Sequence, residues 1–249
     1  MVTARRPRRR GDRRAGRRDQ GVGGQDQEGG VGRAGSRPPG QRVSLEIELK
    51  LALADPGRLG ALLAALPEPA AVVEQRNHYF VDDGRAAAGV PAMVRVRESF
   101  EERDGAMALR AITLTVKRRH QTVDGLFVAE EHEQPLEGAL WEAIGRGAAA
   151  LEAVTGPALD WLRAQGPLGP LRRQGAMTNR RHVVPLGGFT LEVDRTVFPD
   201  GSVDAEVEVE TEDAVGARAV VEAAAAAAGV ALVDQTATKY ARFLVRGGA

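Results

Sequence analysis

The segment Glu46-Ile47-Glu48-Leu49-Lys50 alternates charged and apolar side chains. Successive side chains of a β-strand point to opposite faces, so residues two apart share a face. The three charged side chains of this segment therefore project to one side of the predicted strand, and the apolar ones project to the other. Half-exposed strands often carry a solvated charged face, so this strand alone does not separate a plain surface from a functional site.

The same alternation returns along the chain, but in later segments the charges of one strand share one sign, as in Arg95 and Arg97 or Glu131 and Glu133. A solvated face usually mixes signs, because neighbouring like charges repel. Paired carboxylates supply hard oxygen ligands for Mg²⁺ or Mn²⁺, and clustered Arg and Lys suit phosphate oxygens. The pattern therefore indicates a metal–polyphosphate site. The polar faces carry Glu46, Glu48, Lys50, Arg76, Asn77, Arg95, Arg97, Thr113, Thr115, Lys117, Arg119, Glu131, Glu133, Arg181, Glu192, Asp194, Glu206, Glu208, Glu210 and Lys239.

The composition excludes several other kinds of protein. The chain of 249 residues has no cysteine, which excludes disulfides, thiolate metal sites and thiol catalysis. Its four histidines lack zinc-type spacing, and there is neither a P-loop nor a Gly-x-Ser-x-Gly elbow. No apolar run approaches the roughly 20 residues of a membrane span, and no apolar stretch typical of a secretory signal follows the N-terminal arginines. We therefore expect a soluble, cytoplasmic protein with no membrane partner.

Residues 1–42 differ from the rest of the chain. They hold 12 of the 34 Lys and Arg residues and 4 of the 34 Asp and Glu residues, a net charge of +8. With almost no large apolar side chains, the segment is predicted to be disordered. Two interpretations stay open: an arm that binds nucleic acid or another polyanion, and an extension without function. Residues 43–249 form the predicted folded domain.

Periodicity and turn residues predict eight strands and several helices in this domain. Asp55-Pro56 is typical of a helix start and Gly229 of a helix end. Asp82 to Gly84, Asp104-Gly105 and Pro199 to Gly201 are typical of turns, the last two within hairpins. Mostly hairpin connections favour an α+β fold, mainly antiparallel β, built as a barrel or sandwich with helices outside. The predicted strands are 43–53, 72–81, 92–98, 111–119, 126–134, 177–185, 189–197 and 203–211; the predicted helices are 59–66, 138–165 and 215–228; and a short segment, 236–244, completes the domain.

The ordered series of motifs resembles the CYTH superfamily, the triphosphate tunnel metalloenzymes. In the residue types and spacing of its motifs, the chain from Leu45 to Val245 is most similar to the inorganic tripolyphosphatases of that superfamily. The Glu-x-Glu-x-Lys motif alone is a weak signal, whereas the series across about 200 residues is a strong one. The motifs are Glu46 to Lys50, Gln75 to Phe80, Val94 to Arg97, Leu114 to Lys117, Glu130 to Glu133, Leu191 to Asp194, Glu206 to Glu210 and Thr238 to Tyr240.

The resemblance implies an eight-stranded closed barrel with the charged faces lining a tunnel and the apolar faces packed on outer helices. It implies metal-dependent hydrolysis of tripolyphosphate or a related triphosphate. Ala52 departs from relatives that carry a further basic residue there, which is expected to shift affinity or substrate choice. The implied ligands of Mg²⁺ or Mn²⁺ are Glu46, Glu48, Glu206 and Glu208, with Glu131 and Glu133 for a second ion; the implied catalytic residues are Glu131, Glu133 and Lys50; and the implied substrate-binding residues are Lys50, Arg76, Arg95, Arg97, Lys117, Arg119, Arg181 and Lys239.

Three other functions stay open. Thiamine triphosphate hydrolysis and adenylate cyclisation occur on the same scaffold by resemblance, but no adenine-reading set is evident and the chain is only 4% aromatic. A non-catalytic polyphosphate-binding module would keep the basic lining and lose carboxylates, whereas all the acidic positions are present here. If the tunnel is closed, the segment that carries Lys239 is expected to pair beside the first strands and to place this ammonium among Arg95, Arg97 and Lys117.

Overall fold

The computed structural model describes residues 42–89, 92–103, 106–123 and 125–247, and side chains from residue 46 onward except at a few strand and helix ends. The N-terminal arm predicted at 1–42 lies outside the described residues apart from Arg42, which begins the first strand. The turn expected around Asp104-Gly105 also lies outside them. No helix of the described ranges is long and apolar enough to cross a membrane.

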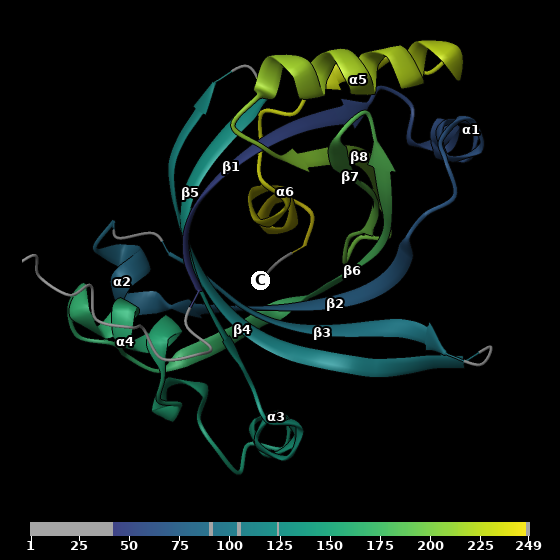
Figure 1. Cartoon of the computed structure of the whole chain (residues 1–249). Helices are drawn as coiled ribbons and strands as arrows, with labels where there is room; N and C mark the ends of the chain where they lie inside the picture. Colours follow the sequence, from purple (N-terminus) through teal and green to yellow (C-terminus); the bar gives the residue numbers. More distant parts are fainter. Residues whose placement is uncertain (1–41, 90–91, 104–105, 124, 248–249) are drawn as a thin grey trace, which may run out of the picture. The chain divides into compact units, whose positions relative to one another are not determined.

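Eight antiparallel strands close into a barrel, seen along its interior in Figure 1. The order β5-β4-β3-β2-β6-β7-β8-β1 closes because β1 also pairs with β5, so the alternative of an open sandwich is excluded. The short β9 pairs with β1 as an added strand outside the closed ring. The strands are β1 (Arg42–Leu53), β2 (Ala71–Asp82), β3 (Met93–Arg103), β4 (Ala106–Val123), β5 (Leu126–Pro135), β6 (Leu171–Leu186), β7 (Phe189–Val197), β8 (Val203–Glu210) and β9 (Leu232–Asp234).

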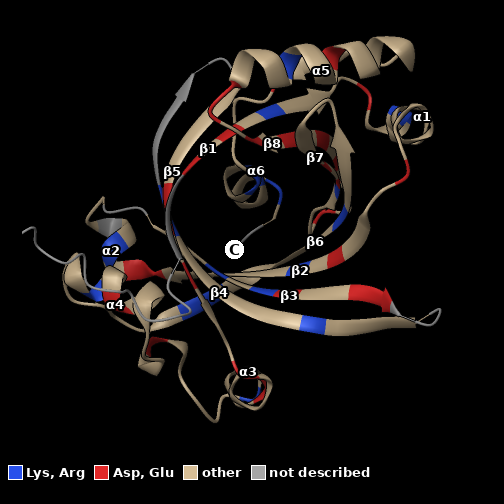
Figure 2. Ribbon diagram, viewed as in Figure 1, with Lys and Arg blue, Asp and Glu red and all other residues tan. Residues whose placement is uncertain are grey.

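The alternation predicted for the strands sets what faces inward and outward. Leu49 and Leu51 of β1 belong to an apolar core on the outer face, whereas Glu48 and Lys50 point into the barrel. The expected arrangement of charged faces inward and apolar faces outward is therefore confirmed. Figure 2 shows the charged positions along the strands that surround the interior.

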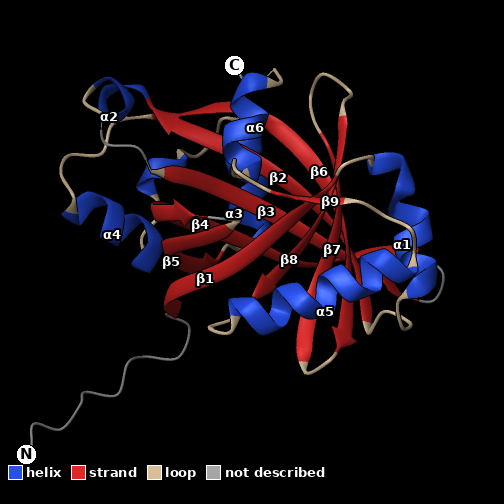
Figure 3. Ribbon diagram, turned by 90° about the horizontal axis from the view of Figure 1, so that it is seen from above, coloured by secondary structure: helices blue, strands red, loops and turns tan. Residues whose placement is uncertain are grey.

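Two apolar cores join the barrel to its outer helices. One packs α1 and α5 on β1, β7 and β8, and the other packs α3 and α4 on β2, β3 and β4 (Figure 3). The helices are α1 (Leu59–Ala65), α2 (Asp83–Ala87), α3 (Gly138–Gly145), α4 (Pro157–Ala164), α5 (Ala214–Ala227) and α6 (Lys239–Val245), with short 3₁₀ turns η1 (Pro56–Arg58) and η2 (Leu151–Ala153).

Several local predictions hold. Asp55 accepts a hydrogen bond from the Gly57 backbone N–H at 2.9 Å and so begins the 3₁₀ turn η1. Gly229 follows α5 with a positive φ of 63°, as expected of a residue that ends a helix. In the hairpin between β7 and β8, Asp200 accepts from the backbone N–H of Ser202.

Other local predictions are wrong. The helical region expected over 138–165 is divided into α3, η2 and α4. The turn expected at Asp82 is instead a helix start, because its carboxylate accepts from the backbone N–H groups of Gly84 and Arg85 and caps α2. Strand β6 begins at Leu171, six residues before the predicted start, because 171–176 continue the pairing with β2.

The C-terminal segment differs most from expectation. Residues 239–245 form the helix α6, and the pairing with the first strand is made earlier, by β9. Phe243 of α6 is fully buried against Tyr79 of β2, Met177 of β6 and Phe198, which follows β7. The helix therefore lies at the barrel interior, as Figure 1 shows, and brings Lys239 to the inward-facing charges.

Candidate functional site

The barrel interior contains a cavity of about 430 Å³, here called the tunnel cavity. Its lining comes from β1, β3, β4, β5, β6, β7 and β8 and from the first turn of α6. Most predicted site residues meet here although the sequence separates them by up to 193 positions, from Glu46 to Lys239. The charged residues that line the cavity are Glu46, Glu48, Lys50, Arg95, Arg97, Lys117, Glu131, Arg181, Glu192, Glu208 and Lys239.

Lys50 lies between two buried carboxylates. Its Nζ is 2.6 Å from Glu48 and also contacts Glu208 on β8, directly opposite Lys50 in the β1–β8 pairing. Burial, with the nearby charge of Glu208, raises the pKa of Glu48 to about 8. Burial also opposes ionisation of Glu208, but Lys239, Lys50 and Arg181 outweigh it and hold the pKa of Glu208 well below its usual range. One carboxylate of the pair thus stays charged and the other binds a proton readily.

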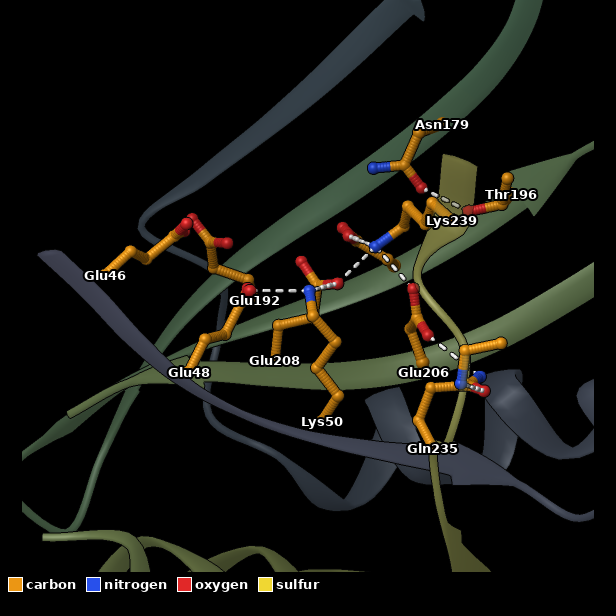
Figure 4. A network of polar contacts seen from close by, with 12 residues as sticks. Glu46, Glu48, Lys50, Asn179, Glu192, Thr196, Glu206, Glu208, Gln235 and Lys239 are labelled. Carbon is orange, nitrogen blue, oxygen red and sulfur yellow. Dashed lines mark hydrogen bonds and ion pairs between the residues drawn. The ribbon is translucent and has the colours of Figure 1, made fainter. Parts of the chain in front are cut away.

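Lys239 lies among three buried carboxylates of β7 and β8. Its Nζ is 2.8 Å from Asp194. It is also 2.5 Å from Glu206 and 2.6 Å from Glu208, which Figure 4 shows beside it. Burial lowers the pKa of this ammonium, but the three carboxylates outweigh burial and raise it. The expectation that Lys239 lies among Arg95, Arg97 and Lys117 is therefore wrong, because its immediate contacts are carboxylates. All four basic residues nevertheless line the same cavity.

Glu206 makes its closest contacts with the C-terminal segment. Both of its carboxylate oxygens accept from Arg242 Nη2, at 2.9 and 2.7 Å, and Gln235 donates to it at 3.2 Å. Arg242 also donates to Asp204 at 2.6 Å. A predicted metal ligand thus also holds α6 against β8.

A second group of charges lies on β4, β5 and the part of β1 that pairs with β5. Lys117 contacts Glu46 and lies 3.1 Å from Glu131. Burial opposes ionisation of Glu131, yet Arg95 and Lys117 lower its pKa to about 2. Burial and the charge of Glu131 raise the pKa of Glu133, which accepts from the Thr115 hydroxyl at 2.8 Å. Two neighbouring carboxylates therefore have pKa values displaced in opposite directions.

Arg97 and Arg95 differ from the other basic residues of the cavity: Arg97 pairs with an amide, and Arg95, although 3.9 Å from Glu131 and 3.7 Å from Glu133, keeps a donor unused by the described residues. Arg97 Nε donates to the Asn77 side chain at 2.8 Å, and Arg97 makes no ion pair with any carboxylate of the described residues. Burial and the charges of Arg95 and Arg181 lower its pKa to about 10. Within the same described set, the buried Nε of Arg95 has no hydrogen-bond partner. These groups favour an anion in the cavity.

Two predicted substrate-binding residues differ from the others. Arg76 points to the outer face of β2, where it is exposed and lies 3.9 Å from Glu98, because its neighbours Gln75 and Asn77 take the inward positions. The prediction that Arg76 lines the tunnel is therefore wrong. Arg119 lies in β4 opposite Ala129, but its side chain is outside the described residues.

Some residues of the site were given no binding or catalytic role from the sequence. Glu192 contacts Arg181, and Asp194 binds Arg181 through both oxygens at 2.8 and 2.6 Å. Both lie in the same alternating face of β7, and the period of two already placed them there. Phe127 and Tyr240 also line the cavity. Phe127 shares the alternating face of Glu131 on β5, so the period of two could have placed it there. Tyr240 could not be selected on this ground, since nothing in the sequence shows that α6 enters the barrel.

The carboxylates on β1, β7 and β8 fit a divalent metal ion. Glu48, Glu192 and Glu208 offer oxygens within 4.8 Å of one another, and so do Asp194, Glu206 and Glu208. Carboxylate oxygens are the ligands that Mg²⁺ and Mn²⁺ prefer. The ammonium groups of Lys50 and Lys239 lie against these oxygens, so the environment stabilises positive charge.

Comparisons with known proteins agree with this architecture. The family model of the CYTH domain matches residues 44–243. A putative adenylyl cyclase from Hippeastrum, described as having a dominant triphosphatase activity, has a TM-score of 0.70 at 22% identity, with 81% of this chain and 96% of that chain covered. A putative adenylate cyclase from Bacillus halodurans has a TM-score of 0.59 at 24% identity, with 82% and 98% covered. No curated protein matches the chain.

Proposed function

The chain belongs to the CYTH family, and from this premise we propose that it is a metal-dependent triphosphatase that hydrolyses a phosphoanhydride bond in the tunnel cavity. The observation that carries the proposal is the pair Arg95 and Arg97, whose donors are not fully used within the protein, beside two groups of carboxylates. A polyphosphate offers oxygens to the first and, with its metal, positive charge to the second. The likeness to solved structures supports the fold on which this arrangement depends.

Basic residues would bind and orient the triphosphate chain. Arg95, Arg97 and Lys117 lie on neighbouring strands, with their side chains lining the cavity. Guanidinium groups bind phosphate oxygens through two parallel hydrogen bonds, and fixed cations stabilise charge that develops on a transferring phosphoryl group. Lys50 of β1, Arg181 of β6 and Lys239 of α6 also line the cavity and would add positive charge.

The metal would be Mg²⁺ or Mn²⁺, held by carboxylates from Glu48, Glu192, Asp194, Glu206 and Glu208. Such an ion, when bound, neutralises phosphate charge and activates water. Glu46, with Glu131 and Glu133 on β5, would serve a second ion.

Glu133 is the best candidate for the group that accepts the proton of the attacking water. Burial and the neighbouring Glu131 raise its pKa, so it holds a proton more readily than an ordinary carboxylate. Glu131, whose pKa is lowered to about 2, stays charged and would orient the water or the ion. Two carboxylates with opposite shifts divide the roles in this way.

Inorganic tripolyphosphate is the proposed substrate, because the named contacts are charge receptors and not base readers. A second candidate, an organic triphosphate such as ATP or thiamine triphosphate, is favoured by the apolar part of the lining, which includes Met93, Phe127 and Tyr240. Aromatic side chains of this kind can stack on a base or a thiazole ring.

A substrate panel tests the proposal. We expect phosphate release from tripolyphosphate, with a kcat/KM higher than for ATP or thiamine triphosphate, and no cyclic AMP from ATP. A higher kcat/KM for either organic triphosphate would move the assignment to the second candidate. Cyclic AMP as the main product would contradict hydrolysis itself.

A further inference from the structure

The ammonium of Lys239, which is expected to bind substrate, lies against three carboxylates. It lies within 2.8 Å of Asp194, Glu206 and Glu208. These same three carboxylates have oxygens within 4.8 Å of one another and could hold a metal ion. The ammonium is therefore placed where it uses the oxygens that a divalent ion would need.

The ammonium of Lys239 and a divalent metal ion cannot both bind these carboxylate oxygens. Asp194 is fully buried, and Glu206 and Glu208 are nearly so. The oxygens that Lys239 does not contact are already occupied, because Arg181 binds Asp194 Oδ1 and Glu208 Oε2 and Arg242 binds Glu206 Oε2. A metal ion beside Lys239 would meet a positive charge at close range in a poorly hydrated site, where repulsion is strong. Seating a divalent ion on this cluster therefore requires the ammonium to move away.

Lys239 can move without unfolding the segment that carries it. It is the first residue of α6, which Thr238 caps by accepting from the Ala241 backbone N–H at 3.0 Å, while Phe243 and Arg242 anchor the helix. The four-carbon stem of Lys239 lines the tunnel cavity. A rotation of this side chain would bring the ammonium from the carboxylates to an anion in the cavity.

We propose that Lys239 is a built-in counter-ion that competes with the divalent metal for Asp194, Glu206 and Glu208, and that the metal releases its ammonium to bind substrate phosphate. The inference rests on the proposed function, because it takes these carboxylates to be metal ligands. It makes metal and triphosphate binding mutually favourable: the metal frees a cation for the phosphate, and the phosphate draws that cation away from the metal site.

The test measures Mn²⁺ binding without substrate, from the electron paramagnetic resonance signal of free Mn²⁺. We expect Lys239→Met, which keeps the length of the stem, to bind Mn²⁺ at least about tenfold more tightly than wild type, as expected for loss of a close charge contact. Arg97→Met is the matched control, because it removes a tunnel cation that has no carboxylate partner among the described residues. Its Mn²⁺ affinity should change by much less.

Thermal unfolding supplies a second readout. In EDTA, Lys239→Met should melt below wild type, because three buried carboxylates lose a cation, and saturating Mn²⁺ should raise its Tm by more than it raises that of wild type. If Lys239→Met does not fold, the comparison is made in a background that lacks one carboxylate charge, with Asp194→Asn as the reference. The double variant Asp194→Asn/Lys239→Met should then bind Mn²⁺ more tightly than Asp194→Asn.

The outcomes separate the two proposals. If Mn²⁺ binds but Lys239→Met binds it no more tightly than Arg97→Met does, competition by Lys239 is refuted while the metal site stands. If neither wild type nor the variants bind Mn²⁺, the metal dependence in the proposed function fails as well. Tighter binding by Lys239→Met alone supports the counter-ion role.

Discussion

Glu48 combines a buried position with a neighbouring carboxylate, and its pKa of about 8 has a consequence for stability. Between the ordinary carboxyl value of 4.5 and about 8, the folded protein binds this proton and the unfolded chain does not. The contribution of Glu48 to stability is therefore fully present at low pH and is lost as the pH rises toward 8.

Glu48→Gln should remove this dependence, because an amide does not titrate. In EDTA, the Tm of the variant should fall less than that of wild type between pH 6 and pH 8. Glu210→Gln is the control, since Glu210 lies on β8 opposite Glu48 in the β1–β8 pairing but is exposed. The Tm of this variant should follow that of wild type. Parallel curves for Glu48→Gln and wild type would show that Glu48 is ionised throughout this range.

Arg97 gives a prediction for activity. Replacing it by methionine removes a guanidinium that has no competing carboxylate, so kcat/KM for tripolyphosphate should fall by about 10²-fold, typical of losing one preorganised electrostatic group. Arg76→Met, on the outer face, should retain the wild-type kcat/KM. Steady-state phosphate release measures both, and a similar loss in the two variants would contradict the assignment of inner and outer faces.

The same two arginines show what the sequence can predict about individual residues. Arg97 ends the alternation Val94-Arg95-Val96-Arg97, so the period of two assigns the faces. Around Arg76 the sequence Gln75-Arg76-Asn77 is polar throughout, and no alternation distinguishes the inward positions. The motif resemblance then selected the charged residue, although the two amides point inward.

At the scale of elements, α6 is stabilised chiefly by Phe243, which is fully buried, while the next residue, Leu244, is 41% exposed. Phe243→Ala should lower the free energy of unfolding by about 3–5 kcal/mol, as for large-to-small changes in a packed core. Leu244→Ala should cost much less. Urea unfolding of both variants measures the difference, and equal losses would mean that α6 is not packed inside the barrel.

The strands were predictable because hairpin turns and the period of two are local signals, and β7 and β8 were placed correctly by them. The C-terminal helix was not predictable in this way. Residues 236–244 are too short for a clear helical period, and their conformation depends on filling the barrel end with Phe243 against Tyr79 and Phe198. Such packing depends on residues far apart in the sequence.

At the scale of the whole molecule, residues 1–41 precede the barrel and have too little apolar content to form a core. Deleting them should leave both the Tm and the triphosphatase activity essentially unchanged. A large loss of either would mean that the segment packs on the barrel. If full-length protein binds RNA or DNA in a salt-sensitive manner and the deletion variant does not, the segment is a nucleic-acid-binding arm.

The closed barrel brings eight acidic and several basic side chains into one interior, and we propose that this interior hydrolyses a triphosphate with the help of a divalent ion. The most direct measurement is the rate of phosphate release from tripolyphosphate by wild-type protein, first in excess EDTA and then with increasing Mg²⁺ or Mn²⁺. We expect no detectable phosphate release in EDTA and a saturable recovery of the rate as metal is added. Release that EDTA does not reduce, or no release at any metal concentration, would contradict it.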